Sequence, residues 1–282
     1  MNKTKKARTV LSVILAFVLS LSLTVLSVAV VADSTVLSSE YAAKSLQRGG
    51  FGSAVRDDLY TEFLSYGNAC NIGDSFFEKF FNDTLSADFI NSDAVVYIVE
   101  VYYDSKATVD TGRLEEALKP ALYDYAVEMG YGDQPNLDDD LNLIVSELCS
   151  IYKAHIELPA VSTLNKMIMR ANKYIDIAII AIAAFILLCA VVLLFSYKPK
   201  IEPFMYLTCA SAGAFLMTLA LPLYLRVTNT IGKVNITGKA MYSFVVTFGN
   251  GVLNAFLIAA GALAILTAFF AILYALRIRK EK

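Results

Sequence analysis

Four stretches of the chain contain no Asp, Glu, Lys, Arg or His, and they constrain its fold more than any other feature. They are residues 10–32, 177–197, 204–225 and 252–276. A helix of about 20 apolar residues crosses the hydrocarbon core of a bilayer, and it satisfies its own backbone hydrogen bonds there. The pattern therefore predicts four transmembrane helices. The alternative is four helices buried in a soluble core, which would require a chain of 282 residues to hide all four stretches.

The first stretch also has features of a secretory signal. Basic residues precede it, and the small residues at its end resemble a cleavage site before Asp33. Its apolar run is longer than the ~7–15 residues that are typical of signal peptides. We therefore interpret residues 10–32 as an uncleaved signal anchor, with cleavage as the alternative.

The Lys and Arg residues that flank the four stretches predict the orientation of the chain. Residues 1–9, 198–203 and 277–282 are all basic, and four spans place these three segments on one side of the membrane. Because cytoplasmic segments carry the excess of Lys and Arg, we expect a multi-pass protein of the plasma membrane with both termini in the cytoplasm. Residues 33–176 and 226–251 would then be extracytoplasmic.

The charge of the chain is divided along the same boundaries. The formal net charge of the whole chain is only -2, but residues 33–176 hold 24 Asp and Glu against 11 Lys and Arg. That acidity would repel nucleic acid, so we expect no nucleic-acid partner. With 57% hydrophobic residues and a mean hydropathy of +0.56, the composition excludes a disordered chain and a simple soluble enzyme.

The acidic segment 33–176 reads as a mostly helical domain, so the predicted fold class is an all-α membrane protein. Residues 93–103 are rich in Val and Ile, which leaves helix and strand in competition, and we favour helix. Ser75 and Glu78 have the spacing of a capping box. The other predicted helices are a segment from Ser38 to Gly49-Gly50, then 51–70, a segment from Asp110-Thr111, 138–157, and 161–175 continuing into the second span.

The second extracytoplasmic segment, 226–251, contains an apolar run at residues 240–248. Gly249-Asn250-Gly251 follows this run and is expected to break it from the fourth span. We therefore interpret residues 240–248 as an interfacial segment on the outer face of the membrane.

Two cysteines, Cys70 and Cys149, lie outside the predicted spans. In an oxidising compartment they can form a disulfide, which would stabilise the domain by about 4 kcal/mol in the chain-entropy model. The alternative is two buried thiols that act as small apolar groups. Cys189 and Cys209 fall in predicted spans and are interpreted as packing residues.

No residue pattern predicts catalysis, a cofactor or a metal site. Asp133 and Asp138–Asp140 resemble an acidic cation site, but a calcium loop starting at Asp138 would need Gly and Glu where Leu143 and Cys149 stand. These aspartates more simply oppose the positive end of a helix. His155 is the sole histidine, which leaves no zinc site of the usual His-rich kinds. We expect it to pack near a helix end.

The predicted spans contain small residues at helical spacing but no ionisable group. Ion-coupled transporters normally place charged residues within the bundle, whereas the most polar residues here are Asn254, Thr208, Thr218 and Thr267, with Pro222 near one helix end. Small residues let helices approach closely. The predicted packing positions are Ala210, Ala214, Ala260, Ala264 and Ala268.

The order of segments resembles a loosely defined set of uncharacterised bacterial four-span membrane proteins with a helical outer domain between spans one and two. The residues that carry this resemblance are Leu37-Ser38-Ser39-Glu40-Tyr41, Val99–Tyr103, and Val109-Asp110-Thr111 leading to Leu114. The resemblance implies an architecture and supplies no activity.

In architecture alone, the chain is also similar to ABC permeases of the cell-division and macrolide-export type. Those permeases are expected to carry a cytoplasmic coupling helix between spans two and three. The corresponding connection here, 198–203, is too short to dock an ATPase. A transport-related membrane subunit is therefore the second hypothesis for function, and a membrane enzyme is the third.

The leading hypothesis is a non-enzymatic integral membrane protein. Its acidic extracytoplasmic domain would bind a protein partner in the cell envelope or a second copy of the chain, and the spans would contact the lipid bilayer. The sequence identifies neither the partner nor the biological process.

Overall fold

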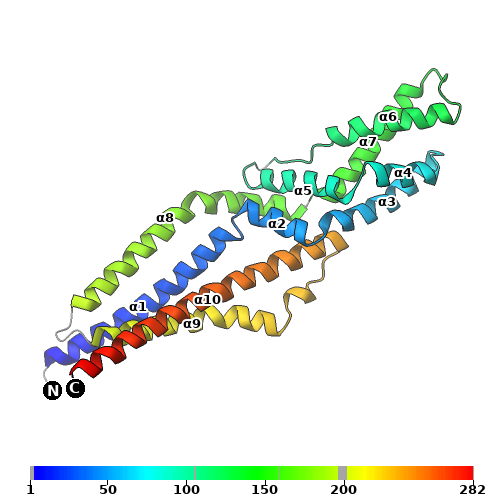
Figure 1. Cartoon of the computed structure of the whole chain (residues 1–282). Coiled ribbons are helices and arrows are strands. Elements are labelled where there is room, and N and C mark those ends of the chain that lie inside the picture. The colour runs from blue at the N-terminus through cyan, green and yellow to red at the C-terminus, as the bar shows by residue number, and fades with distance from the viewer. Residues whose placement is uncertain (1–2, 105, 158, 196–201, 282) are drawn as a thin grey trace. The chain divides into compact units, whose positions relative to one another are not determined.

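In the computed structural model, the described residues are 3–104, 106–157, 159–195 and 202–281, and no strand occurs among them. The prediction of an all-α protein is confirmed. In chain order the elements are α1 (Lys3–Ser34), α2 (Ser39–Arg48), α3 (Phe51–Ala69), α4 (Asp74–Asp83), α5 (Ala87–Val101), α6 (Gly112–Glu128), α7 (Leu137–Ile156), α8 (Pro159–Phe195), α9 (Glu202–Val227), the short 3-10 helix η1 (Ile231–Lys233) and α10 (Lys239–Glu281) (Figure 1).

The chain forms two compact units. Unit 1 comprises Met1–Ser38, Arg170–Lys233 and Gly249–Lys282, and unit 2 comprises Ser39–Met169 and Val234–Phe248. The boundaries after Met169 and Phe248 fall inside helices, so α8 and α10 each contribute residues to both units.

Unit 2 has an apolar core to which α2 through α7 all contribute. Helix α6 shows why the sequence produces it, because Leu114, Leu118 and Leu122 recur at every fourth position and are all buried. This spacing places side chains on one face of a helix. The largest fully buried side chains are Tyr152, Phe51, Phe63, Phe77, Phe81, Leu46, Leu59, Leu85, Ile90, Ile98, Leu114 and Leu118.

Aromatic rings pack α3 against α4 in this core. The ring of Phe63 meets Phe77 and Phe81 edge to face, with centroid distances of 6.2 and 5.5 Å. Helix α3 can approach this closely because residue 67 is glycine. A Cβ atom there would lie 2.1 Å from the Phe77 ring.

The predicted helix boundaries in unit 2 are largely confirmed. Helix α2 stops where the two glycines were expected to end it, and Gly50 has the left-handed φ of 69°. Residues 87–101 form a helix, α5, and its first turn is capped by the side chain of Ser86. The capping box at Ser75 is wrong, since α4 begins at Asp74, so Ser75 lies inside the helix and Gly73 is the N-cap residue.

The expected break at Gly249-Asn250-Gly251 is also wrong, because α10 runs unbroken from Lys239 to Glu281. A glycine within a helix costs only about 1 kcal/mol, and tertiary packing outweighs this cost here. Ala240 and Phe244 are buried in the core of unit 2. Residues 240–248 therefore belong to α10 and contribute to the core of unit 2, and their place at the membrane interface stays a prediction.

Helix α2 holds this first part of α10. The hydroxyl of Tyr41 donates to the carbonyl of Phe248 at 3.2 Å, and their rings meet edge to face at 5.3 Å. At the end of α2, a Cβ on Gly49 would lie 3.1 Å from the carbonyl oxygen of Ser243. The close approach of the two helices therefore requires the small residue.

Helix α8 confirms that the segment from residue 161 onward continues into the second apolar stretch. It begins at Pro159, a residue favoured at the first helical position. The amide nitrogen of Asn165, which is buried, donates to the carbonyls of Val101 and Asp104. This contact fixes the first turns of α8 to the end of α5.

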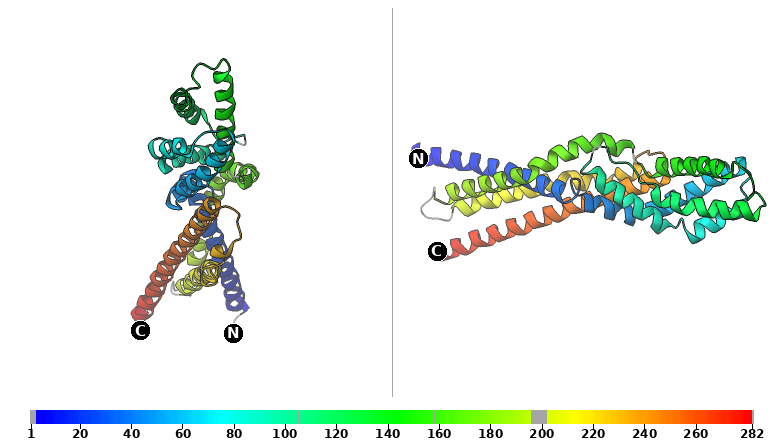
Figure 2. Two further views of the ribbon diagram at one scale, coloured as in Figure 1. Left: turned by 90° about the vertical axis from the view of Figure 1, so that its right-hand side faces the viewer. Right: turned by 90° about the horizontal axis from the view of Figure 1, so that it is seen from above.

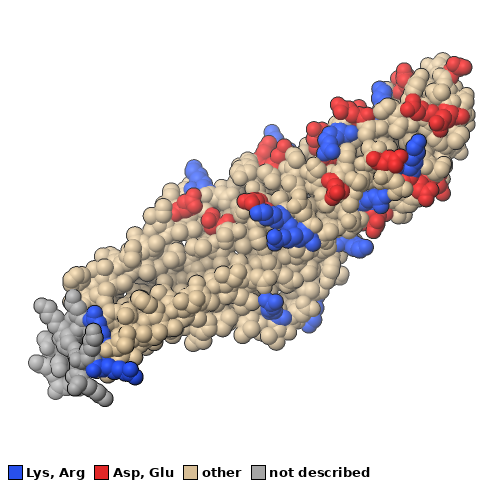
Figure 3. Space-filling view, viewed as in Figure 1, with Lys and Arg blue, Asp and Glu red and all other residues tan. Residues whose placement is uncertain are grey.

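Four helical segments are long and apolar enough to cross a membrane: Arg8–Ser34, Asn165–Phe195, Glu202–Lys233 and Lys239–Arg279. They contain the four predicted stretches, apart from residues 196 and 197, which lie outside the described residues. The most apolar window of α8 is only 11% buried, as is that of α10. In Figure 3 the surface of α8, α9 and α10 is largely free of charged side chains.

Within unit 1, the start of α1 and the end of α10 lie at the same end in all views (Figures 1 and 2). Most of the predicted loop 198–203, on which the comparison with permeases depends, lies outside the described residues, because the structure resumes at Glu202.

Candidate functional site

Unit 2 has a groove between α6 and α7. It has a volume of about 620 Å³. Because α6 buries its leucines in the core, its charged and aromatic side chains face outward and supply most of the lining. The lining residues are Gly112, Glu115, Glu116, Lys119, Pro120, Tyr123, Asp124, Asp138 and Leu141.

The groove is acidic. Four of its lining residues are carboxylates and one is a lysine, and none of these five side chains forms an ion pair within the described part of the chain. The fourth carboxylate, Asp138, comes from the first turn of α7. Like charges held along one groove repel each other, so a cation bound there would relieve that repulsion.

Pro120 lies in the lining of the groove and inside α6, which continues past it. Proline has no N–H, so the carbonyl of Glu116 does not receive the backbone hydrogen bond usual in a helix.

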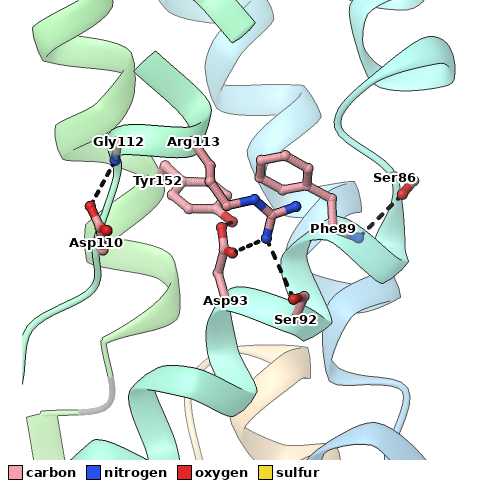
Figure 4. A network of polar contacts seen from close by, with 8 residues as sticks. All are labelled: Ser86, Phe89, Ser92, Asp93, Asp110, Gly112, Arg113 and Tyr152. Atoms are coloured by element: carbon pink, nitrogen blue, oxygen red, sulfur yellow. Dashed lines mark hydrogen bonds and ion pairs between the residues drawn. The ribbon is translucent and has the colours of Figure 1, made fainter. Parts of the chain in front are cut away.

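A buried polar network holds α6 where it forms the groove (Figure 4). The carboxylate of Asp93, on α5, is only 9% exposed. One of its oxygens accepts from Nη1 of Arg113 on α6, and the other accepts from the hydroxyl of Tyr152 on α7, each at 2.7 Å. The carboxylate thus joins three helices, and both of its oxygens are satisfied, as burial of a charge requires.

The Arg113 side chain also stacks on an aromatic ring. Its Cζ atom lies 4.2 Å from the centroid of the Phe89 ring, a cation–π contact that contributes about 0.5–2 kcal/mol. Just before α6, the side chain of Asp110 accepts from the backbone N–H of Gly112 at 2.9 Å. These contacts fix the end of α6 at which Gly112 lines the groove.

The network changes the acidity of Tyr152. Burial, together with the hydrogen bond to Asp93 and the negative charge of that residue, raises the pKa of the Tyr152 phenol well above its usual value of 10. The phenol is therefore a neutral donor at physiological pH. It is enclosed in the core with no exposed surface, so it holds the helices together and does not contact solvent.

This network was not predicted from the sequence, although the sequence contains a signal for it. Asp93 lies between Ile90 and Tyr97 on the buried face of α5. An acid at a core position of an amphipathic helix requires a buried partner. The partners come from helices 20 and 59 residues away along the chain, so spacing alone does not identify them.

The two cysteines of the predicted disulfide are free thiols in the structure. Cys149 is buried in the core, and burial with the nearby negative charge of Glu115 raises the pKa of its thiol. Cys70 follows the end of α3 and is partly buried. The alternative of two thiols acting as apolar groups describes the structure, and pairing under oxidising conditions stays a prediction.

Three of the aspartates considered as a cation site lie at the N-terminal end of α7. Asp138, Asp139 and Asp140 occupy the first turn of α7, where the positive end of the helix stabilises negative charge. Among the described residues, no group of three or more His, Cys, Asp or Glu side chains has the arrangement of a metal site. His155 lies in the last turn of α7, and its Nε2 is 3.3 Å from a carboxylate oxygen of Glu62.

The predicted packing alanines differ in their surroundings. Ala210, Ala214 and Ala260 are 1% or less exposed, whereas Ala264 is half-buried and Ala268 is exposed. The first two lie in a cluster that packs α9 against α1. Ala268 does not serve the predicted packing role within one chain.

Helix α1 supplies the other half of this interface, which the sequence analysis missed. Ser12, Ala16 and Ser20 recur at every fourth position and are all buried. A Cβ on Gly213 of α9 would lie 2.6 Å from Oγ of Ser20. Small residues at this spacing are the pattern that allows close packing of helices in lipid, and the pattern was visible in the sequence.

Comparison of the chain with protein-family models, with curated proteins and with solved structures gives no match.

Proposed function

We propose that this chain is a non-enzymatic integral membrane protein whose acidic domain binds a basic segment of a partner protein in the groove between α6 and α7. The observation that carries the proposal is the lining of the groove, where four carboxylates face one lysine. We further propose that the domain is extracytoplasmic, that both termini are cytoplasmic, and that the membrane is the plasma membrane of the cell.

Membrane insertion is supported by the surfaces of the apolar helices. Ile180 and Leu187 on α8 are 69% and 66% exposed, and Ile258 on α10 is 74% exposed. Exposed apolar side chains along whole helices are unfavourable in water and favourable in lipid. The basic residues that flank the spans support the proposed orientation.

The chemistry of the groove supports a basic segment as its ligand. The Lys and Arg side chains of the ligand would meet Glu115, Glu116 and Asp124. The apolar stems of these Lys and Arg side chains would pack on Tyr123 and Pro120. Charge complementarity of this kind accelerates association and selects partners. The partner would be an envelope protein or a second copy of the chain that presents a basic segment.

Site-specific photocrosslinking of the full chain in intact cells tests this proposal. A photoreactive amino acid at Tyr123 is expected to capture a protein through a Lys- or Arg-rich segment, identified by mass spectrometry. The matched control places the same probe at Leu143, which is 70% exposed on α7 and does not line the groove.

Charge reversal makes the test specific. Glu116→Lys with Asp124→Lys should abolish the crosslink from Tyr123, whereas Asp133→Lys, an exposed change outside the groove, should leave it intact. Equal capture from both probe positions, or capture that survives the double reversal, would refute the proposed groove interaction.

A further inference from the structure

A second hollow, in unit 1, has a different chemistry. It lies where the end of α9 and the following turn meet α10, and its volume is about 370 Å³. Its polar lining consists of one cation, Arg226, and the three amide side chains of Asn229, Asn250 and Asn254. Leu225 and Leu253 add an apolar side.

The cation of this pocket has no acidic partner. Nη1 of Arg226 donates to Oδ1 of Asn254 at 2.7 Å, and within the described ranges no carboxylate pairs with Arg226. A guanidinium has five N–H donors, so most of them stay available to a ligand. The bond to Asn254 orients the guanidinium at the pocket without neutralising it.

The turn after α9 adds a fixed amide. Asn229 has a left-handed φ of 49°, and its N–H donates to the carbonyl of Arg226 at 3.2 Å. A Cβ on Gly232 would lie 2.7 Å from Oδ1 of Asn229. The side chain of Asn229 is thus held against the turn, beside the arginine.

The surroundings of the pocket are apolar and exposed. On α9, Leu221 and Tyr224 are 63% and 64% exposed. On α10, Asn254 is a polar residue within the charge-free stretch 252–276, near its start. Tyrosine is enriched where a span meets the headgroup layer of a bilayer, and Tyr224 directly precedes the pocket residues Leu225 and Arg226 at the end of the predicted span 204–225.

We propose that this pocket binds the phosphate of an anionic phospholipid headgroup. A guanidinium flanked by amide donors matches the oxygens of a phosphate, and the acyl chains would lie along the exposed apolar residues of α9 and α10. This inference rests on the proposed insertion in a membrane, but it is independent of the partner proposed for the acidic groove.

Lipid binding to the full chain in detergent, measured by native mass spectrometry, tests the inference with phosphatidylglycerol as the probe. Arg226→Gln is expected to weaken binding about tenfold, the change that loss of one charge-assisted hydrogen bond typically produces. Asn254→Leu should weaken it as well. Lys233→Gln is the matched control, since it removes the same charge from the same turn but does not line the pocket.

Two further probes identify the source of the phosphate. Diacylglycerol, which has no phosphate, should bind weakly and equally to all variants. Inorganic phosphate at millimolar concentration should not displace phosphatidylglycerol from the unmodified chain. Binding of inorganic phosphate that depends on Arg226, without binding of phosphatidylglycerol, would overturn the lipid assignment.

Equal loss of phosphatidylglycerol with Arg226→Gln and Lys233→Gln would also overturn the inference, because it would indicate attraction by general charge. Failure of the partner proposal would appear separately, as a Tyr123 crosslink that is absent from the unmodified chain or that survives the double charge reversal, without a change in lipid binding. Failure of membrane insertion would appear as a chain that stays soluble without detergent.

Discussion

The phenol of Tyr152 donates a 2.7 Å hydrogen bond to the carboxylate of Asp93, and both side chains are buried. Together with Arg113, these residues join α5, α6 and α7 around one negative charge. A buried carboxylate that loses a donor keeps its desolvation cost, so the network is sensitive to the loss of any member. The same contacts determine where α6 lies and thus the form of the acidic groove.

Tyr152→Phe should lower the free energy of unfolding of unit 2 by about 1–3 kcal/mol, because it removes a hydrogen bond to a charged group. Denaturant unfolding of the detergent-solubilised full chain, followed by near-UV circular dichroism, measures the effect. Tyr123→Phe is the control, because Tyr123 is exposed. Equal stabilities for the two variants would show that the network contributes little.

Alkaline pH should destabilise unit 2 through its buried tyrosines. Burial raises the pKa of Tyr102 to about 12, and the pKa of Tyr152 is also raised. The folded state holds the protons of these phenols more tightly than the unfolded state does. Their contribution to the free energy of unfolding is therefore complete below the unfolded pKa of 10 and is lost as the pH rises above it. The expected slope is about 1.4 kcal/mol per pH unit for each tyrosine.

This slope can be assigned to individual residues. Tyr102→Phe should flatten the decrease in stability between pH 10 and about 12, whereas Tyr103→Phe, at a position that is 68% exposed, should not. A decrease that is the same in all variants would refute the assignment.

Cys70 should react with iodoacetamide before Cys149 does. Cys149 is buried, and its raised pKa lowers the fraction of reactive thiolate. Mass analysis of the full chain without reductant should show Cys70 modified in the folded state and Cys149 modified only after unfolding. Protection of both thiols until a reductant is added would instead indicate the disulfide.

Phe244→Ala should destabilise unit 2 by about 3–5 kcal/mol, the usual cost of truncating a buried phenylalanine. The side chain of Phe244 is 7% exposed and belongs to the core. Ile258→Ala, further along the same helix and 74% exposed, is the control. Limited proteolysis of residues 39–169 reports the change, and equal protection of the two variants would contradict the core assignment.

Ala214→Leu should disrupt the packing of α9 on α1. Ala214 has no exposed surface, and the larger side chain would overpack the interface at a cost of about 1–3 kcal/mol. Ala268→Leu makes the same change at an exposed position. Unfolding in mixed detergent micelles distinguishes the two, and equal stabilities would argue against a close α1–α9 interface.

The features that could be predicted from the sequence are those with a local cause. The four apolar helices follow from the absence of charge over about 20 residues, and the end of α2 follows from two adjacent glycines. The helical state of residues 87–101 depended on a weaker signal. Val and Ile are compatible with both states, and the cap at Ser86 favours the helix.

The features that could not be predicted depend on distant segments. Nothing near Gly249 indicates that α10 continues, because Tyr41, which holds Phe248, is on α2, 207 positions earlier. The acidic groove likewise requires the arrangement of α6 against α7. In the sequence, Lys119 and Asp138 indicate only that each lies on the exposed face of a helix. They do not indicate that the two helices form a groove.

The helical phase of α10 matters within unit 2. Ala240, Phe244 and Phe248 recur at every fourth position of this helix, and all three belong to the core of unit 2 or pack against it. Each residue turns a helix by about 100°. One residue inserted between Ala240 and Phe244 would therefore turn both phenylalanines away from the helix face that Ala240 buries.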